Sequence, residues 1–336
     1  MAKRALITGV LGQDGAYLAK LLLELGYEVF GGVRRSSSLP TWRLGKLGLL
    51  ERVKLVQVDL QEMSNIMRTV RSVQPDELYN LAAQSFVGVS FEQPLLTADI
   101  DAFGAVRLLE AIRTESPHTR FYQASSSEMF GLAHETPQTE RTQFHPRSPY
   151  GAAKAYAHYM TVNYREAYCM HASSGILFNH ESPLRGPEFV TRKITTGLAR
   201  IHHGERKPVE LGNLEARRDW GFAGDYVRGM WLMLQQPLGG DYILATGKNH
   251  SVRDFFDSAA EYAGFQVRWD GEGVHAVATD AKSGAILARV DQAFSRPCEV
   301  ESLTGDATKA RTVLGWESVM GFEQLVEMMM RADLSP

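Results

Sequence analysis

The 336-residue sequence has only two cysteines, Cys169 and Cys298, and neither lies in a CxxC pair or at a metal-ligand spacing. Two free thiols in a reducing compartment are therefore expected. The sequence also lacks any run of the roughly 20 apolar residues that a membrane span needs. Its first apolar run ends at Gly9, which argues against a secretory signal. These absences predict a soluble, cytoplasmic protein with no membrane partner.

An excess of basic charge is missing too, because 36 lysines and arginines stand against 39 aspartates and glutamates. This balance argues against a nucleic-acid partner. Two short basic clusters, Arg34 with Arg35 and Arg217 with Arg218, suit a small phosphorylated ligand or are solvated surface. No metal is predicted, since neither the adjacent His202 and His203 nor His134 and His145 belong to a ligand set.

Strand-like and helix-like segments alternate through the first half of the chain. Strands are predicted at residues 5–8, 28–33, 53–58, 77–83 and 120–124, with helical stretches such as 105–113 between them. The alternation predicts an α/β fold, a Rossmann-type doubly wound parallel sheet with helices on both faces. Ligands bind such a sheet at the carboxyl ends of its strands.

From about residue 174 the pattern becomes irregular. It predicts strands at 175–179, 209–212 and 242–246, helices at 190–202, 223–235 and 251–263, and a loop or small hairpin at 271–288. We therefore predict a Rossmann domain over 1–173, with later crossings near 174–180 and 209–246. A smaller mixed α/β lobe that binds the substrate is predicted mainly over 181–336.

A glycine-rich turn follows the first predicted strand and opens the first helix. Its candidate cofactor-binding residues are Gly9, Gly12, Gln13, Asp14 and Gly15, in a GxxGxxG pattern. The glycines allow a tight turn and let a pyrophosphate approach the backbone at the helix N-terminus. A turn without a ligand is the plain alternative, but the strand–turn–helix context favours a dinucleotide site.

The second predicted strand is followed by Arg34, Arg35 and Ser36, where an NAD enzyme usually places an acidic residue. Arginines and serines better suit a 2′-phosphate, so NADP is favoured. These arginines could instead be solvated or reach another subunit. Asp59 and Leu60 follow the third strand as candidates on the adenine side, although Asp59 could equally be a helix N-cap.

The end of the fourth predicted strand contains small residues that would let the backbone run beside a cofactor. The cofactor-binding candidates there are Leu81, Ala82, Ala83, Gln84 and Ser85, of which Ser85 is also a substrate-binding candidate. All lie at a strand end, where ligands of such sheets bind.

Four residues form the candidate catalytic set: Ser126, Glu128, Tyr150 and Lys154. Tyr150 and Lys154 are four residues apart and share one helix face. A neighbouring ammonium favours the phenolate, which predicts a tyrosine base near neutral pH. One base suffices to oxidise an alcohol, and a second base, Glu128, could also move a carbon-bound proton. The plain alternatives are a surface or capping role for Glu128 and an exposed helical position for Lys154.

This set resembles the extended short-chain dehydrogenase/reductase superfamily, in which the tyrosine is the base and the lysine holds the nicotinamide ribose. Longer segments resemble one family within it, the GDP-mannose 4,6-dehydratases. They lie at residues 7–18, 34–38, 80–85, 148–150, 176–183, 189–193, 218–223, 296–300 and 314–316. The Asn-His-Glu-Ser-Pro run at 179–183 and the Arg-Asp-Trp run at 218–220 are the most specific.

The resemblance implies an internal redox reaction on GDP-mannose. Tyr150 would take the O4 proton while C4 gives a hydride to NADP, and Glu128 would remove the C5 proton and help expel the C6 hydroxyl as water. Return of the hydride to C6 gives GDP-4-dehydro-6-deoxy-D-mannose, and NADP is not consumed. Ser126 stands where the family usually has threonine. Only the stiffening β-methyl is lost, so we expect activity to persist.

The resemblance also implies the binding residues. On the substrate side they are Asn179, Lys193, Arg218, Arg296 and Glu299, with Val190, Gly212 and Arg217 as weaker candidates, and on the cofactor side His180 and Arg185. Lys193 and Arg217 could instead be ordinary surface charges. A homotetramer is implied as well, in which the segment 34–38 reaches a neighbour's cofactor site, with a dimer as the simpler alternative.

Two other functions stay open. One is a different nucleotide-sugar enzyme of the same superfamily, such as a 4-epimerase, a 4-reductase or a dehydratase for another nucleotide. The other is a catalytically silent NADP-binding sensor or scaffold. An epimerase needs no C5 base, so Glu128 argues against a 4-epimerase. A sensor needs no second base, so the complete catalytic set argues against a silent protein.

Overall fold

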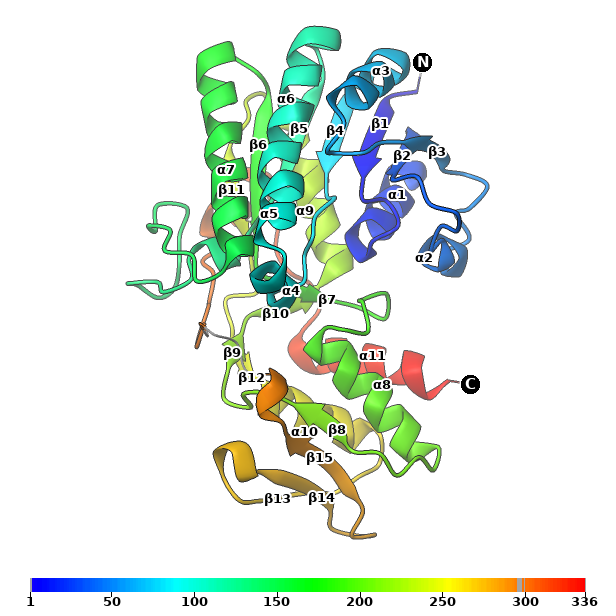
Figure 1. Ribbon diagram of the computed structural model, residues 1–336, viewed down its shortest axis with the longest axis vertical. Coiled ribbons are helices and arrows are strands. Elements are labelled where there is room, and N and C mark those ends of the chain that lie inside the picture. The colour runs from blue at the N-terminus through cyan, green and yellow to red at the C-terminus, as the bar shows by residue number, and fades with distance from the viewer. Residues whose placement is uncertain (1, 295–297, 299, 336) are drawn as a thin grey trace.

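The computed structural model describes residues 2–294, 298 and 300–335. Its upper lobe is built on a parallel sheet with helices on both faces, and its lower lobe on a smaller mixed sheet (Figure 1). Within the described residues, no helix combines the length and the apolar character needed to cross a membrane.

The upper lobe contains a seven-stranded sheet in which every neighbouring pair is parallel. In spatial order its strands are β11 (Asp241–Leu244), β6 (Ala172–Leu177), β5 (Arg120–Ser126), β4 (Glu77–Asn80), β1 (Arg4–Thr8), β2 (Glu28–Val33) and β3 (Lys54–Gln57). The direction of strand order reverses between β1 and β4. Such a reversal opens a crevice at the carboxyl ends of the two strands.

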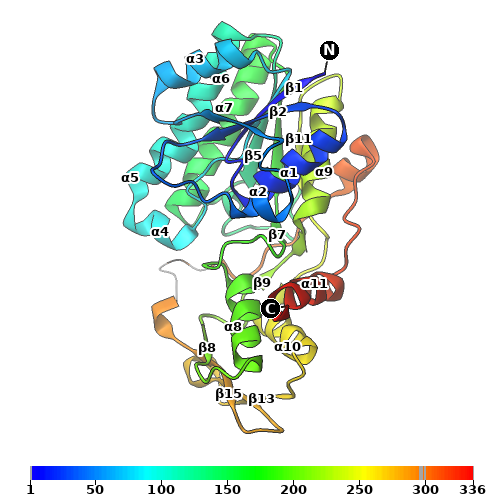
Figure 2. The same cartoon turned by 90° about the vertical axis from the view of Figure 1, so that its right-hand side faces the viewer.

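Helices cover both faces of this sheet (Figure 2). One face carries α1 (Gln13–Glu24) and α9 (Ala223–Gln235), which pack on each other, and the other carries α3 (Met63–Val73), α6 (Gly104–Glu115) and α7 (Pro149–Tyr168). Helix α3 illustrates the local reason. Its buried residues Ile66, Val70 and Val73 recur at the spacing of one helix face.

A helical stretch before α6 contains an irregular turn. Helices α4 (Val87–Glu92) and α5 (Pro94–Thr97) lead into a π-helical turn, η1 (Ala98–Phe103), which continues directly into α6. The short helix α2 (Trp42–Lys46) follows β2. A π-helical turn is wider than an α-helical turn and often occurs at a functional site.

The lower lobe packs helices α8 (Val190–His202), α10 (Val252–Tyr262) and α11 (Phe322–Leu334) beside a mixed sheet. The sheet has the order β13 (Val267–Asp270), β14 (Val277–Asp280), β15 (Ile286–Val290) and β8 (Val209–Leu211). Two small two-stranded sheets are also present: β7 (Asn179–Glu181) with β10 (Trp220–Phe222), and β9 (Arg217–Arg218) with β12 (His250–Ser251). The core of this lobe includes Trp220, Phe255 and Phe256.

Most predicted elements match the observed ones. The predicted helices 190–202 and 223–235 coincide with α8 and α9, and the predicted hairpin is β14 with β15. The predicted strand 77–83 is wrong at its end, because β4 stops at Asn80. Beyond it, the backbone N–H groups of Leu81 and Ala82 donate to the side-chain hydroxyl of Thr8 in β1, both at 3.2 Å, whereas a continuing strand would bond to backbone carbonyls. The division into domains at residues 173 and 181 stays a prediction.

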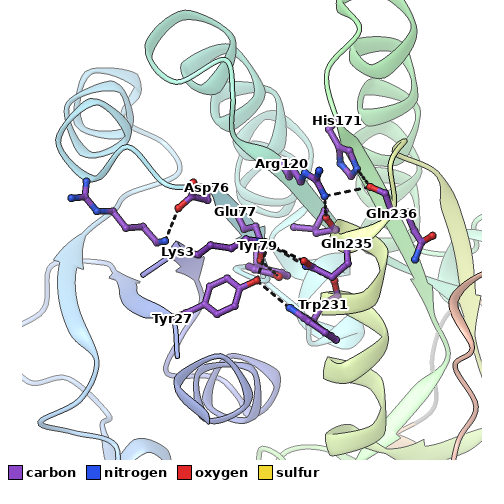
Figure 3. Close-up of polar contacts among 12 residues, drawn as sticks. Lys3, Tyr27, Asp76, Glu77, Tyr79, Arg120, His171, Trp231, Gln235 and Gln236 are labelled. Atoms are coloured by element: carbon purple, nitrogen blue, oxygen red, sulfur yellow. Dashed lines mark hydrogen bonds and ion pairs between the residues drawn. The ribbon is translucent and has the colours of Figure 1, made fainter. Parts of the chain in front are cut away.

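At the amino end of the sheet, far from its carboxyl-end crevice, a buried carboxylate gathers donors from several elements (Figure 3). Glu77 is 1% exposed. It accepts hydrogen bonds from Lys3 Nζ, Tyr27 Oη, Tyr79 Oη and Gln235 Nε2, at 2.7 to 3.3 Å. This cluster ties the starts of β1, β2 and β4 to α9, and its charge is satisfied by these donors.

We expect Glu77→Ala to lower the free energy of unfolding by about 1–3 kcal/mol, because it leaves the buried Tyr79 hydroxyl and the part-buried donors of Tyr27 and Gln235 without their acceptor. Urea or thermal denaturation measures this loss. The exposed Glu51 supplies a matched control, and Glu51→Ala should change stability by less than about 0.5 kcal/mol. Equal stability of both variants would contradict a structural role for the cluster.

Candidate active site

A cavity of about 750 Å³ lies at the carboxyl ends of the parallel strands and is lined by both lobes. Most of the predicted site residues line it. They are Gly9, Gly12, Gln13, Asp14, Gly15, Leu81, Ala83, Ser85, Ser126, Glu128, Tyr150, Lys154, Asn179, His180, Arg185, Val190, Lys193, Gly212 and Arg218. The chain thus brings the candidate catalytic set and the glycine turn into one space.

Other predicted residues do not line this cavity. Arg34, Arg35 and Ser36 follow β2 and are exposed, and Asp59, Leu60, Ala82, Gln84 and Arg217 also lie outside the lining. Arg217 donates to Asn249 Oδ1 at 2.9 Å and lies 3.7 Å from Asp254, so it serves a lobe contact here. Arg296 and Glu299 lie outside the described residues.

The glycine turn needs its glycines for steric reasons. Gly9 has φ +71°, and a Cβ there would lie 2.8 Å from the backbone nitrogen of Ala82. A Cβ at Gly15 would lie 2.3 Å from the carbonyl oxygen of Gly9. No side chain caps α1, whose N-cap is Gly12. Its first N–H groups therefore face the cavity as donors suited to a phosphate.

An ion pair links this turn to the strand β7. The Asp14 carboxylate accepts a hydrogen bond from His180 Nε2 at 2.7 Å, and the carbonyl oxygen of Phe178 accepts one from His180 Nδ1 at 2.7 Å. Because both partners are acceptors, both ring nitrogens donate and the ring is an imidazolium. Burial alone lowers the pKa of His180, but the charge and hydrogen bond of Asp14 outweigh burial and raise it.

Helix α7 positions Tyr150 and Lys154. Ser148 caps the helix by accepting from the Gly151 N–H at 3.0 Å, and Pro149 occupies the first turn. Both functional side chains are buried. The Lys154 ammonium donates to the carbonyl oxygen of Ala124 at 3.0 Å and lies 5.7 Å from the centre of the Tyr150 ring. The predicted shared helix face is confirmed.

The predicted effect of the ammonium on the tyrosine is wrong for this structure. Burial raises the pKa of Tyr150, and the nearby Asp101 carboxylate raises it further, while a hydrogen bond from Ser126 lowers it in part. Burial also lowers the pKa of Lys154, against the opposing charges of Asp101 and Asp14. Desolvation therefore outweighs the attraction between ammonium and phenolate that the spacing suggested.

Glu128 enters the cavity from a short 3₁₀ turn, η2 (Ser127–Met129), directly after β5. The Ser126 hydroxyl caps this turn by accepting from the Glu128 N–H at 3.2 Å. A residue missed by the sequence reasoning, Gly151, lets α7 approach the turn. A Cβ at Gly151 would lie 2.6 Å from the carbonyl oxygen of Glu128. Its place beside Tyr150 in a run of small residues was the available signal.

The lower lobe contributes cations to the far end of the cavity. Lys193 of α8 lies with its ammonium 3.2 Å from the centre of the Phe294 ring and donates to the Glu210 carbonyl oxygen at 3.3 Å. Burial lowers its pKa. Arg218 is buried and also lines the cavity. Phe294, another residue of the lining, was not predicted from the sequence.

The sequence pattern of GDP-mannose 4,6 dehydratase matches residues 6–329. A GDP-mannose 4,6-dehydratase of Sinorhizobium fredii (strain HH103) is 55% identical over 99% of this chain and 97% of its own length. GDP-mannose 4,6 dehydratase 1 of Arabidopsis thaliana is 50% identical over 99% of this chain and 90% of its own. The chain belongs to the GDP-mannose 4,6-dehydratase family.

Solved structures show how widely the fold of this family recurs. UDP-glucose 4-epimerase of Thermus thermophilus, solved in complex with NAD, superposes with a TM-score of 0.80 at 25% identity and covers 99% of both chains. RMD from Pseudomonas aeruginosa, complexed with NADPH, has a TM-score of 0.76 at 19% identity over the full length of both chains. The Rossmann-type fold predicted for this dehydratase-family chain is confirmed.

The imidazolium of His180 predicts a pH-dependent stability. Because Asp14 raises the pKa of His180, its contribution should be complete below about pH 6.5, the ordinary value, and fade as pH rises through the raised value. His180→Asn should therefore melt below the unmodified protein at acidic pH, with a gap that narrows at alkaline pH. His118→Asn, at an exposed histidine, is the control and should show no such trend. A gap independent of pH would contradict the charged ring.

Proposed function

We propose that this protein is a GDP-mannose 4,6-dehydratase that uses NADP and yields GDP-4-dehydro-6-deoxy-D-mannose. One observation carries the proposal: Ser126, Glu128, Tyr150 and Lys154 line the same cavity as the glycine turn. The relatives named for this activity, which match almost the whole chain, support it. A second base in the cavity is what distinguishes elimination from simple oxidation.

The residues divide the proton chemistry between them. Tyr150, whose hydroxyl is paired with Ser126, accepts the O4 proton of the mannose. Ser126 and Tyr150 together orient that oxygen. Glu128, on the short turn after β5, removes the C5 proton and delivers a proton to the departing C6 hydroxyl, which leaves as water. Lys154, fixed on the carbonyl oxygen of Ala124, holds positive charge beside the phenol.

The residues around the glycine turn fit a dinucleotide. The uncapped start of α1 and the close approach at Gly9 and Gly15 make room and donors for a pyrophosphate. NADP, when bound, supplies the acceptor and donor of the hydride, and its cationic nicotinamide favours the ionised form of Tyr150. Arg34 and Arg35, exposed after β2, suit a 2′-phosphate and support NADP over NAD.

The nucleotide diphosphate of the substrate would bind in the lower lobe. Lys193 and Arg218 offer positive charge in the lining, and Asn179 offers an amide donor in the same lining. Arginine and lysine are the side chains suited to phosphate oxygens. Lys193 could exchange its contact with the Phe294 ring for a phosphate.

The test is to incubate the purified protein with GDP-mannose, without added cofactor, and to detect loss of water by mass spectrometry. We expect the dehydrated product and a copurified NADP, identified in the same spectra. Product from another nucleotide sugar alone would favour a related dehydratase. Absence of any reaction, even with NADP supplied, would favour the silent sensor.

Glu128→Gln should separate oxidation from elimination. Without the C5 base, we expect dehydration to fall by about 10²- to 10⁴-fold. Absorbance of reduced nicotinamide should still rise when GDP-mannose is added, because Tyr150 is intact. Glu92→Gln, at an exposed carboxylate of the same cavity, is the control and should keep full activity. Normal dehydration by Glu128→Gln would refute its proposed role.

We further propose a homotetramer, with a dimer as the simpler alternative. Large apolar side chains are exposed on α5, η1 and α7; they are Leu95, Phe103, Tyr156 and Tyr159, with exposures of 85%, 48%, 42% and 58%. Such a patch on one face suits contact with a second copy.

Leu95→Glu should reduce the molecular mass of the assembly in solution, since it places a charge in the proposed contact. Because the Leu95 side chain is 85% exposed, the substitution should change the stability of the single subunit little. Light scattering measures the change. Leu238→Glu, at a 78% exposed leucine elsewhere, should leave the mass unchanged. An unaltered mass for both variants would contradict this interface.

A further inference from the structure

A buried carboxylate near the catalytic helix has no part in the chemistry described so far. Asp101 lies on the π-helical turn η1 and is only 2% exposed. Its Oδ1 accepts a hydrogen bond from the Gln84 N–H at 2.7 Å. Its Oδ2 is buried without a hydrogen-bond partner among the described residues. The sequence reasoning did not single it out.

The position of Asp101 connects two parts of the active site. The turn η1 packs against α7, which carries Tyr150 and Lys154. Gln84 belongs to the loop after β4, in which Leu81, Ala83 and Ser85 line the cavity. The Gln84 side chain folds this loop by accepting from the Phe86 N–H at 2.9 Å. Asp101 thus fixes the loop through Oδ1, while its Oδ2 stays buried in the protein interior.

The buried Asp101 carboxylate lowers the stability of the folded protein. A buried charge with an unsatisfied oxygen is unfavourable, and burial raises the pKa of Asp101 to about 6 although the Lys154 ammonium and the Gln84 N–H oppose the rise. An asparagine could accept from Gln84 equally well without this charge. Groups that reduce stability in this way are typical of functional sites.

We propose that Asp101 is a positioning residue of the active site, the buried counter-charge that keeps the Lys154 ammonium charged beside Tyr150. The proposal deepens the dehydratase function and rests on it for its catalytic part. Asp101 lies on the π-helical turn that packs against α7, so its buried charge is held beside the helix that carries Tyr150 and Lys154. Its other oxygen holds the loop along the cofactor side of the cavity.

The surrounding charges are consistent with this role. Asp99, on the same turn, is already paired with Arg107 at 2.7 Å and with the Gln61 amide, so it is engaged elsewhere. The charge of Asp101 acts on Tyr150 and Lys154 of α7, and the charge of Asp14 in α1 also acts on Lys154. On Tyr150, the remaining charges are those of Glu128 and Arg185.

Removal of the Asp101 charge should shift the pKa values of its neighbours in a defined direction. A negative charge raises the pKa of both Tyr150 and Lys154, so Asp101→Asn should lower both. The acid limb of the pH–rate profile, set by Tyr150, and the alkaline limb, set by Lys154, then both move toward lower pH. Near and below pH 6 the native carboxyl is itself protonated, and the two proteins should converge.

The first arm of the test needs neither substrate nor cofactor. Since the pKa of Asp101 is raised on folding, the native carboxylate lowers stability as pH rises through about 6. Asp101→Asn should therefore melt about 2–4 °C above the unmodified protein at about pH 8, with a smaller gain at about pH 4.5. A variant that melts lower at both pH values would show that Asp101 is only a structural anchor and would overturn the proposal.

The second arm measures turnover of GDP-mannose. Asp101→Asn should shift the kcat profile by about one pH unit toward acid and reduce kcat at about pH 8 roughly tenfold, with KM nearly unchanged. Asp99→Asn is the matched control and should leave the profile in place. Full activity with an unshifted profile would overturn the positioning role. If neither protein acts on GDP-mannose, the dehydratase function fails while the melting arm still decides whether the carboxylate is a buried charge.

Discussion

The active site depends on how two strands are joined where the sheet reverses direction. Thr8, at the end of β1, is 1% exposed, and its hydroxyl donates to Asn80 Oδ1 at 2.7 Å. The Thr8 hydroxyl oxygen in turn accepts hydrogen bonds from the backbone N–H groups of Leu81 and Ala82. This contact ends β4, turns its loop along the cavity and sets that loop against Gly9. Without it, the glycine turn and the loop that faces it would have no fixed separation.

From this junction the site is built by close approach of backbone segments. Gly9 and Gly15 let the turn fold against the loop after β4 and against itself, and Gly151 lets α7 reach the turn that carries Glu128. The two bases therefore converge because the chain lacks side chains at these points of contact. Their order in space follows from parallel strands that all end at the same edge of the sheet.

The sequence predicts the fold and the outline of the site well, and its failures have a common cause. Periodicity identified α8 and α9 with their observed bounds, and spacing placed Tyr150 and Lys154 on one face. The end of β4 was missed because it depends on Thr8, which is distant in sequence. The raised pKa of Tyr150 was missed because it depends first on burial in the folded chain and then on the distant Asp101 carboxylate. Asp101 also required a π-helical turn, which local patterns do not reveal.

The two ends of the parallel sheet treat buried charge in opposite ways. At the amino end, Glu77 is buried among donors that satisfy it, which favours stability. At the carboxyl end, Tyr150 and Lys154 are buried with shifted pKa values, and Asp101 keeps an oxygen without a partner among the described residues. Buried polar groups that gain a partner only when a ligand binds reduce the stability of the ligand-free protein. A well-satisfied amino end can offset that cost, so the same strands hold the fold at one end and leave the other reactive.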